Sequence, residues 1–93
     1  MIKHIVCMKL KDKAEATKIK EMLESLVDLI PPLLTMEVGL DYLQSERSYD
    51  MALIATYKTR EDLETYRVHP EHKKVQAYIH AVRESSVSVD FEF

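Results

Sequence analysis

Two segments of this sequence alternate so that apolar side chains fall on both sides of an extended strand. Residues 2–10 place Val6 and Met8 on one side and Cys7 on the other, with further apolar residues on each side. Residues 49–58, "YDMALIATYK", are likewise apolar on both sides. Strands of this kind are typical of the centre of a sheet, where both faces are at least partly covered.

Two other segments predict strands with one wet face. In residues 33–43 and 85–93, apolar and polar side chains alternate from Leu34 to Tyr42 and from Ser86 to Phe93. In the first of them the apolar side runs from Leu34 through Val38 to Tyr42. Its even-numbered residues should therefore face the core. Gly39, the only glycine of the chain, predicts a bulge or a close backbone approach inside this strand.

Local signals also mark the helices. Asp12 is a suitable cap for a helix with apolar residues at helical spacing, which Pro31 and its neighbouring proline would end. Thr59 predicts the cap of a second, short helix that turns Leu63 and Tyr66 inward. A third helix follows directly. The predicted order is strand 2–10, helix 12–30, strand 33–43, strand 49–58, helix 59–68, helix 70–82 and strand 85–93.

This order is that of the split βαβ, or ferredoxin-like, plan, an α+β fold in which a four-stranded antiparallel sheet carries its helices on one face. The plan puts the first and third strands at the centre, which suits the two strands that are apolar on both sides. The uncovered face would then carry Ile5, Cys7, Ala52 and Ile54. An apolar patch of this kind predicts a homodimer joined through the sheet face.

Composition limits the class of protein and its partners. The 93 residues fit one domain, residues 1–93, and the net charge of −3 arises from interleaved signs, so we expect no nucleic-acid partner. No apolar run approaches the roughly 18 residues of a membrane helix, and the charged N-terminal stretch is unlike a signal peptide. We therefore expect no membrane association. Cys7 is the only cysteine, which excludes an internal disulfide. A cytoplasmic location is the simplest expectation.

The segment "YRVHPEHKKVQAYIHAVR" contains three of the four histidines. Pro70 suits the first position of a helix, which makes His69 the cap and puts His72 in the first turn. His72 shares a helical face with Val75, whereas His80 is expected to lie off this face and off the wall of any cavity beneath the helix. A helix start is therefore enough to explain the spacing of these histidines, without a catalytic or metal-binding role.

The same segment also predicts a small-molecule pocket. His4 faces the same way as Val6 and Met8, and in this fold the broken helix packs over that strand, so His4, Tyr66, His69 and His72 should converge on one cavity. Each of these residues alone has a structural explanation, as a satisfied core residue or a cap. The positive end of the helix should keep His72 neutral, which suits a general base.

A metal site has less support. His69 and His72 have no evident third ligand, and "HPEH" lacks the spacing of an HExxH metal motif. We expect no metal and no cofactor.

Four segments resemble one protein family, the stress-responsive A/B-barrel (Dabb) family: "IKHIVCMKLKD", "IPPLLTMEVGLDY", "YDMALIATYKTREDLETYRVHPEH" and "VSVDFEF". The resemblance implies a homodimer with a central barrel and a cavity beneath the helices of each subunit. One plant member of the family is a cofactor-free polyketide cyclase. The resemblance places its catalytic histidine and tyrosine at His72 and Tyr66, and its strand histidine at His4. Where that cyclase has a further tyrosine on its first helix, this chain has Leu23.

The sequence therefore predicts a pocket for a small organic molecule. If the protein is an enzyme, we expect a cofactor-independent lyase, cyclase or isomerase with His72, Tyr66 and His4 as its catalytic residues. The alternatives are a non-enzymatic stress-response or assembly protein, in which these residues only pack the barrel, and a cofactor-free monooxygenase, which no residue specifically supports. The predicted ligand-binding residues are His4, Val6, Met8, Leu23, Tyr66, His69 and His72.

Overall fold

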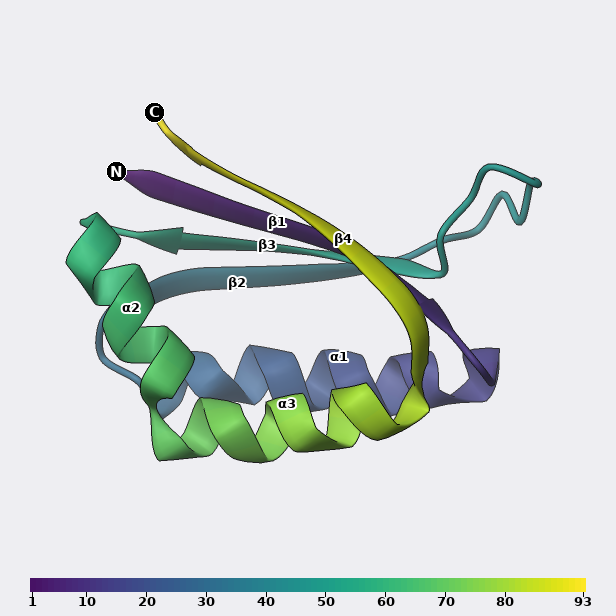
Figure 1. Ribbon diagram of the computed structural model, residues 1–93, viewed down its shortest axis with the longest axis horizontal. Helices are drawn as coiled ribbons and strands as arrows, with labels where there is room; N and C mark the ends of the chain where they lie inside the picture. The colour runs from purple at the N-terminus through teal and green to yellow at the C-terminus, as the bar shows by residue number, and fades with distance from the viewer.

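The fold is the predicted ferredoxin-like βαββαβ arrangement, seen in a computed structural model that describes residues 1–93. Figure 1 shows a sheet in one layer and the helices in a second layer beneath it. The elements are β1 (Ile2–Leu10), a 3-10 turn η1 (Lys13–Glu15), α1 (Ala16–Ser25), a 3-10 turn η2 (Leu26–Asp28), β2 (Leu33–Leu40), β3 (Met51–Tyr57), α2 (Arg60–Val68), α3 (Pro70–Val82) and β4 (Arg83–Glu92).

The four strands form one antiparallel sheet in the order β2-β3-β1-β4. The two strands that are apolar on both sides, β1 and β3, lie at its centre, as predicted. Across the β1–β4 pair, His4 is opposite Asp90 and Met8 is opposite Ser86. The odd-numbered side of β4 therefore shares a face with the odd-numbered side of β1.

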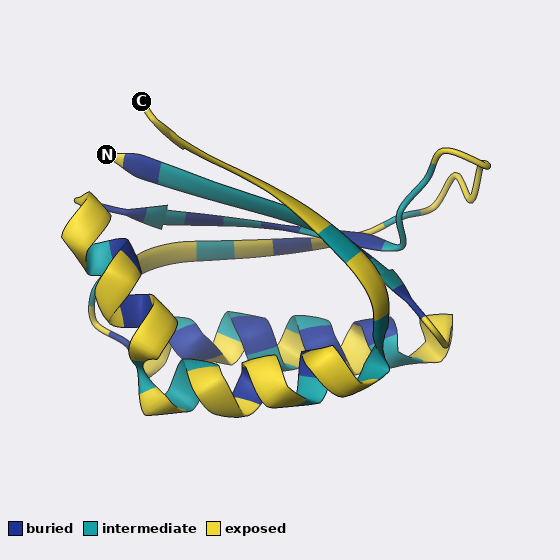
Figure 2. Cartoon of the chain, in the orientation of Figure 1, coloured by how far each residue is buried: buried dark blue, intermediate teal, exposed yellow.

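One core lies between the sheet and the helices. It comprises 18 buried residues, and Tyr57, Ile19, Leu23 and Leu26 are among its largest fully buried side chains. Figure 2 shows buried residues recurring along α1 and α2, whereas β4 is exposed over most of its length. Burial of this apolar side of α1 against the sheet is what holds the two layers together. None of the helices is long and apolar enough to span a membrane.

The edge strand β2 differs from its predicted pattern. Its pairing with β3 shifts between Leu33 and Thr35, so Leu34 is an extra residue in the ladder and is 45% exposed. Such a bulge reverses the alternation, which turns Leu33 inward together with the even-numbered residues that follow. The prediction of a bulge or close approach at Gly39 is wrong, because Gly39 pairs regularly and no atom lies within 4 Å of where its Cβ would be.

The apolar side predicted for residues 33–43 also ends earlier than expected. Strand β2 ends at Leu40, which is itself 43% exposed, and Tyr42 lies beyond it with 91% of its surface exposed. Tyr42 belongs to the loop between β2 and β3, which no helix covers in Figure 1.

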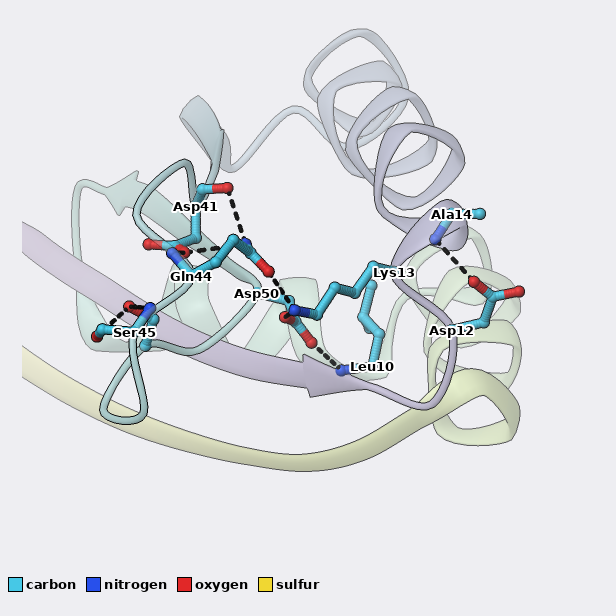
Figure 3. Close-up of polar contacts among 9 residues, drawn as sticks. Leu10, Asp12, Lys13, Ala14, Asp41, Gln44, Ser45 and Asp50 are labelled. Carbon is cyan, nitrogen blue, oxygen red and sulfur yellow. Dashed lines mark hydrogen bonds and ion pairs between the residues drawn. The ribbon is translucent and has the colours of Figure 1, made fainter.

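That loop is fastened to the end of β1 by polar contacts, which Figure 3 shows in close-up. The Asp50 carboxylate accepts a hydrogen bond of 2.7 Å from the Leu10 amide and lies 3.8 Å from the Lys13 ammonium. Lys13 also contacts Gln44. The predicted cap is present, since the Asp12 carboxylate accepts from the Ala14 amide at 2.9 Å. These contacts fix the point at which the chain leaves β1 for the helical layer.

The second face of the sheet has no helix over it (Figure 1). The predicted side chains Ile5, Cys7, Ala52 and Ile54 are all partly exposed there. On β4, Val87 and Val89 pair with Cys7 and Ile5 and are 52% and 61% exposed. The apolar side of β4 thus extends the uncovered face, and its polar side points toward the helices.

Candidate functional site

A cavity of about 320 Å³ lies between the sheet and helices α2 and α3. Its wall combines apolar side chains from the core with polar side chains from β1, β4 and α3. Every predicted ligand-binding residue except His69 lines it: His4, Val6, Met8, Leu23, Tyr66 and His72. A cavity in which apolar side chains and convergent polar groups share the wall is typical of a small-molecule site.

The break between α2 and α3 sets the geometry of the polar end. Pro70 is the first residue of α3, and the Nδ1 of His69 accepts a hydrogen bond of 3.1 Å from the Glu71 amide, so His69 is the helix cap. The chain turns sharply here, which places the first turn of α3 against the last turns of α2. As a result His72 packs on Tyr66, with 4.2 Å between ring centroids and 39° between ring planes.

One backbone contact determines the tautomer of His72. Its Nδ1 lies 3.1 Å from the carbonyl oxygen of Arg67. A carbonyl oxygen only accepts, so Nδ1 must carry the proton and donate. In the neutral ring Nε2 is then unprotonated and is the nitrogen able to accept a proton or a hydrogen bond.

The surroundings of His72 favour its neutral form. Burial lowers the pKa of His72 below its ordinary value of 6.5, against the opposing effect of its hydrogen bond to the Arg67 carbonyl, and the nearby His4 lowers it further. The expected direction is confirmed, although burial, and not the positive end of α3, is the largest cause. At neutral pH the ring is therefore a hydrogen-bond acceptor and a potential base.

Two tyrosines lie beneath His72. The rings of Tyr66 and Tyr57 are 5.3 Å apart between centroids, and both residues are buried. Burial raises the pKa of the Tyr66 hydroxyl and, together with Tyr66, that of Tyr57. Both phenols are consequently protonated at neutral pH, and Tyr66, which lines the cavity, is available as a donor.

Asp90 is a site residue that the sequence reasoning missed. The Nδ1 of His4 hydrogen-bonds to the Asp90 carboxylate, whose other oxygen lies 3.8 Å from the Arg67 guanidinium. This pairing puts the proton on Nδ1 of His4, as the carbonyl does for His72. The alternation of β4 puts Asp90 on its polar side, and only the pairing of His4 with Asp90 shows that this polar side shares the cavity face of β1.

His69 is the helix cap that the sequence predicted, but neither it nor His80 has the expected relation to the cavity wall. His69 does not line the cavity, because its Nδ1 caps α3. The expectation that His80 lies away from the cavity wall is wrong, since His80 lines the cavity from an exposed position two turns along α3. No three His, Cys, Asp or Glu side chains lie close enough together to hold a metal ion.

These groups combine the chemical types that proton transfer requires. An acceptor nitrogen on His72, a phenol donor on Tyr66 and an imidazole on His4 fixed by a carboxylate all border one cavity. Removal of a proton beside a carbonyl group requires a protein base and a protein hydrogen-bond donor that both reach the same bound molecule.

The model of the "Stress responsive A/B Barrel Domain" family matches residues 2–93. A stress-response A/B barrel domain-containing protein of Arabidopsis thaliana is 35% identical over 78 residues, which are 81% of this chain and 30% of that protein. The chain thus spans under a third of the length of this relative.

Solved structures show the same fold over nearly the whole chain. A dimeric protein of unknown function with a ferredoxin-like fold from Bacteroides fragilis is 32% identical, with a TM-score of 0.89 over 99% of this chain and 95% of that one. A dimeric ferredoxin-like protein of unknown function from Thermobifida fusca is 25% identical, with a TM-score of 0.86 over 99% and 90%. Both neighbours are dimeric.

Proposed function

Because the chain belongs to the stress responsive A/B barrel (Dabb) family and carries this cavity, we propose that it binds a small organic molecule there and moves a proton on it without a cofactor. One observation carries the proposal: the neutral ring of His72 packs against the Tyr66 phenol. Its Nδ1 donates a hydrogen bond to the Arg67 carbonyl. This contact leaves Nε2 as the acceptor nitrogen of a residue that lines the cavity.

The proposed step is enolisation of a carbonyl compound. Nε2 of His72 takes a proton from the carbon next to the carbonyl group, and the electron pair of the broken C–H bond moves onto the carbonyl oxygen. Tyr66 donates a hydrogen bond to this developing enolate, and His4, held by Asp90, orients the substrate. Nε2–H then returns the proton to another carbon of the enolate, which completes an isomerisation. In a cyclase reaction the enolate carbon instead attacks a second carbonyl group of the same molecule to form a C–C bond, and Nε2–H protonates the resulting alkoxide.

The test is proton exchange on a simple diketone. Pentane-2,4-dione in D2O is followed by NMR with and without protein. The His72→Asn variant keeps a side-chain amide that can donate to the Arg67 carbonyl but removes Nε2. We expect this variant to lose the protein-dependent rate by about a hundredfold or more, because general acid–base catalysis contributes roughly 10²–10⁴-fold.

The matched control is His69→Asn. It makes the same substitution outside the cavity, and asparagine is a good helix cap. The control should exchange deuterium like the parent. If the parent accelerates exchange no more than His72→Asn does, enolisation by His72 is refuted, and the non-enzymatic alternative, in which these side chains only pack the barrel, is favoured.

We further propose that two copies join through their uncovered sheet faces. The dimeric neighbours from Bacteroides fragilis and Thermobifida fusca support this assembly. So does the apolar patch of Ile5, Cys7, Val87 and Val89, which no element of this chain covers.

A further inference from the structure

Arg83 lines the cavity and has no carboxylate partner. Its side chain is half-buried, and its single hydrogen bond, of 2.8 Å, goes from Nη1 to the Ser86 hydroxyl. It takes part in none of the ion pairs of the structure. Arg67, by contrast, lies 3.8 Å from both Glu64 and Asp90. A guanidinium that is partly buried and lacks a counter-ion is able to bind an anion.

Helix capping does not explain this arrangement. Arg83 follows the last residue of α3, where a cation is favoured by the helix dipole. However, its hydrogen bond goes to Ser86, three residues further along the chain. The C-terminal end of α3 already has a cationic donor, since the Lys11 ammonium donates to the Ala81 carbonyl at 3.4 Å. The guanidinium of Arg83 is thus held on the cavity wall.

Other donors surround the cavity at the same end. Gln76 and His80 precede Arg83 by seven and three residues, which puts all three on one side of the helix axis, and all three line the cavity. Ser86 lines it from β4, opposite Met8. This donor end contains no carboxylate, because the one acidic residue of the cavity wall, Asp90, is paired with His4.

The donor end is well separated from the proton-transfer end. His72 and His80 are eight residues apart on α3, which corresponds to about 12 Å. On the opposite wall, His4 and Met8 are four residues apart on β1, or about 13 Å. Between the two ends the wall carries Val6 from β1, its neighbour Ser88 from β4 and further aliphatic side chains.

We propose that the ligand of this cavity is an elongated organic anion, with a carboxylate on Arg83, an apolar body along Val6 and a reacting end at His72. The planar fork of a guanidinium matches a carboxylate with two parallel hydrogen bonds. Gln76, His80 and Ser86 supply further donors around the same group. The proposal rests on the proposed function and narrows its substrate class to carboxylic acids with an apolar chain.

The test compares octanoate with octanamide, a neutral molecule of the same length. Binding of each is measured by calorimetry to the parent protein, Arg83→Gln, Arg83→Lys and the control Arg47→Gln, which alters an exposed arginine in the loop between β2 and β3. We expect the parent and the control to bind octanoate about tenfold more tightly than octanamide, since a hydrogen bond to a charged group is worth roughly that much. Arg83→Gln should lose the preference, and Arg83→Lys should keep part of it.

Two results would overturn the proposal. One is a parent protein that binds both molecules equally or binds neither. The other is a preference for octanoate that survives in Arg83→Gln. Neither result bears on deuterium exchange of pentane-2,4-dione, which carries no carboxylate, so the failure of the anion site is distinguishable from the failure of the proposed function.

Discussion

The Nδ1 of His72 lies 3.1 Å from the carbonyl oxygen of Arg67, and this contact decides which nitrogen of the ring can act as a base. The contact exists because α2 ends just before Pro70, so that the last turn of α2 presents its free carbonyl groups to the first turn of α3. The end of α2 thus supplies the backbone carbonyl that orients the ring of His72.

Acid should destabilise the parent protein more than the His72→Asn variant. The pKa of His72 is lowered on folding, so below its unfolded value of about 6.5 the unfolded chain binds more protons than the folded one. The folded state therefore loses stability as the pH falls from 6.5 toward the lower folded value. Urea unfolding at pH 7.5 and pH 5 measures this. A variant that loses as much stability as the parent would contradict the depressed pKa.

Removal of the buried Tyr57 hydroxyl should not destabilise the fold. This hydroxyl is buried and no protein group forms a hydrogen bond of normal geometry with it. Leaving a buried polar group unpaired costs about 1–3 kcal/mol, so Tyr57→Phe should raise the free energy of unfolding by up to that amount. Chemical denaturation measures the change. A loss of more than about 1 kcal/mol would mean that the hydroxyl has a partner.

Tyr66→Phe should slow deuterium exchange, whereas Tyr57→Phe should not. Both Tyr66→Phe and Tyr57→Phe delete one phenol oxygen from a pair of adjacent, tilted rings, but only Tyr66 lines the cavity. We expect Tyr66→Phe to slow protein-dependent deuterium exchange by tenfold or more, within the range for one general acid, and Tyr57→Phe to leave it unchanged. Equal rates in the two variants would remove Tyr66 from the mechanism.

His69 should matter for stability and not for ligand binding. Its Nδ1 caps α3, and loss of a cap costs about 1 kcal/mol, so His69→Ala should lower the free energy of unfolding by that order while His69→Asn retains it. Urea titration of both variants gives the comparison. If the two variants were equally stable, the side chain of His69 would not be the cap.

The uncovered sheet face should control assembly. Val89 is 61% exposed in one copy, and a lysine there would place a charge in the proposed interface. We expect Val89→Lys to sediment as a monomer at micromolar concentration, whereas the parent and Thr17→Lys, on the exposed side of α1, sediment as dimers. A parent protein that is monomeric by light scattering at this concentration would refute the dimer.

Local signals in the sequence predicted the part of the site that lies on one continuous segment. Thr59 and Pro70 fix where α2 and α3 begin, and the helical period then orients Tyr66 and His72 without reference to the rest of the chain. The caps are seen directly, with the Thr59 hydroxyl accepting from the Asp62 amide at 3.1 Å. This is why the pairing of two residues from different helices could be anticipated.

Features that depend on strand pairing could not be predicted in the same way. The bulge at Leu34 is imposed by the register of β2 on β3, and no residue type there indicates it. The alternation places Asp90 on a wet face, although the polar side of an edge strand can equally face a cavity. Arg83 was missed because its role depends on the absence of a carboxylate near it, which only the folded chain shows.

The role of His72 as a base is tested most directly by its protonation state, observed by ¹⁵N NMR of the imidazole rings. The geometry predicts that His72 is neutral at pH 7 with its proton on Nδ1, and that His69, whose Nδ1 accepts from the Glu71 amide, carries its proton on Nε2. Titration should place the pKa of His72 below 6.5. A proton on Nε2 of His72 at pH 7, or a pKa at or above 6.5, would contradict the assignment of His72 as the base.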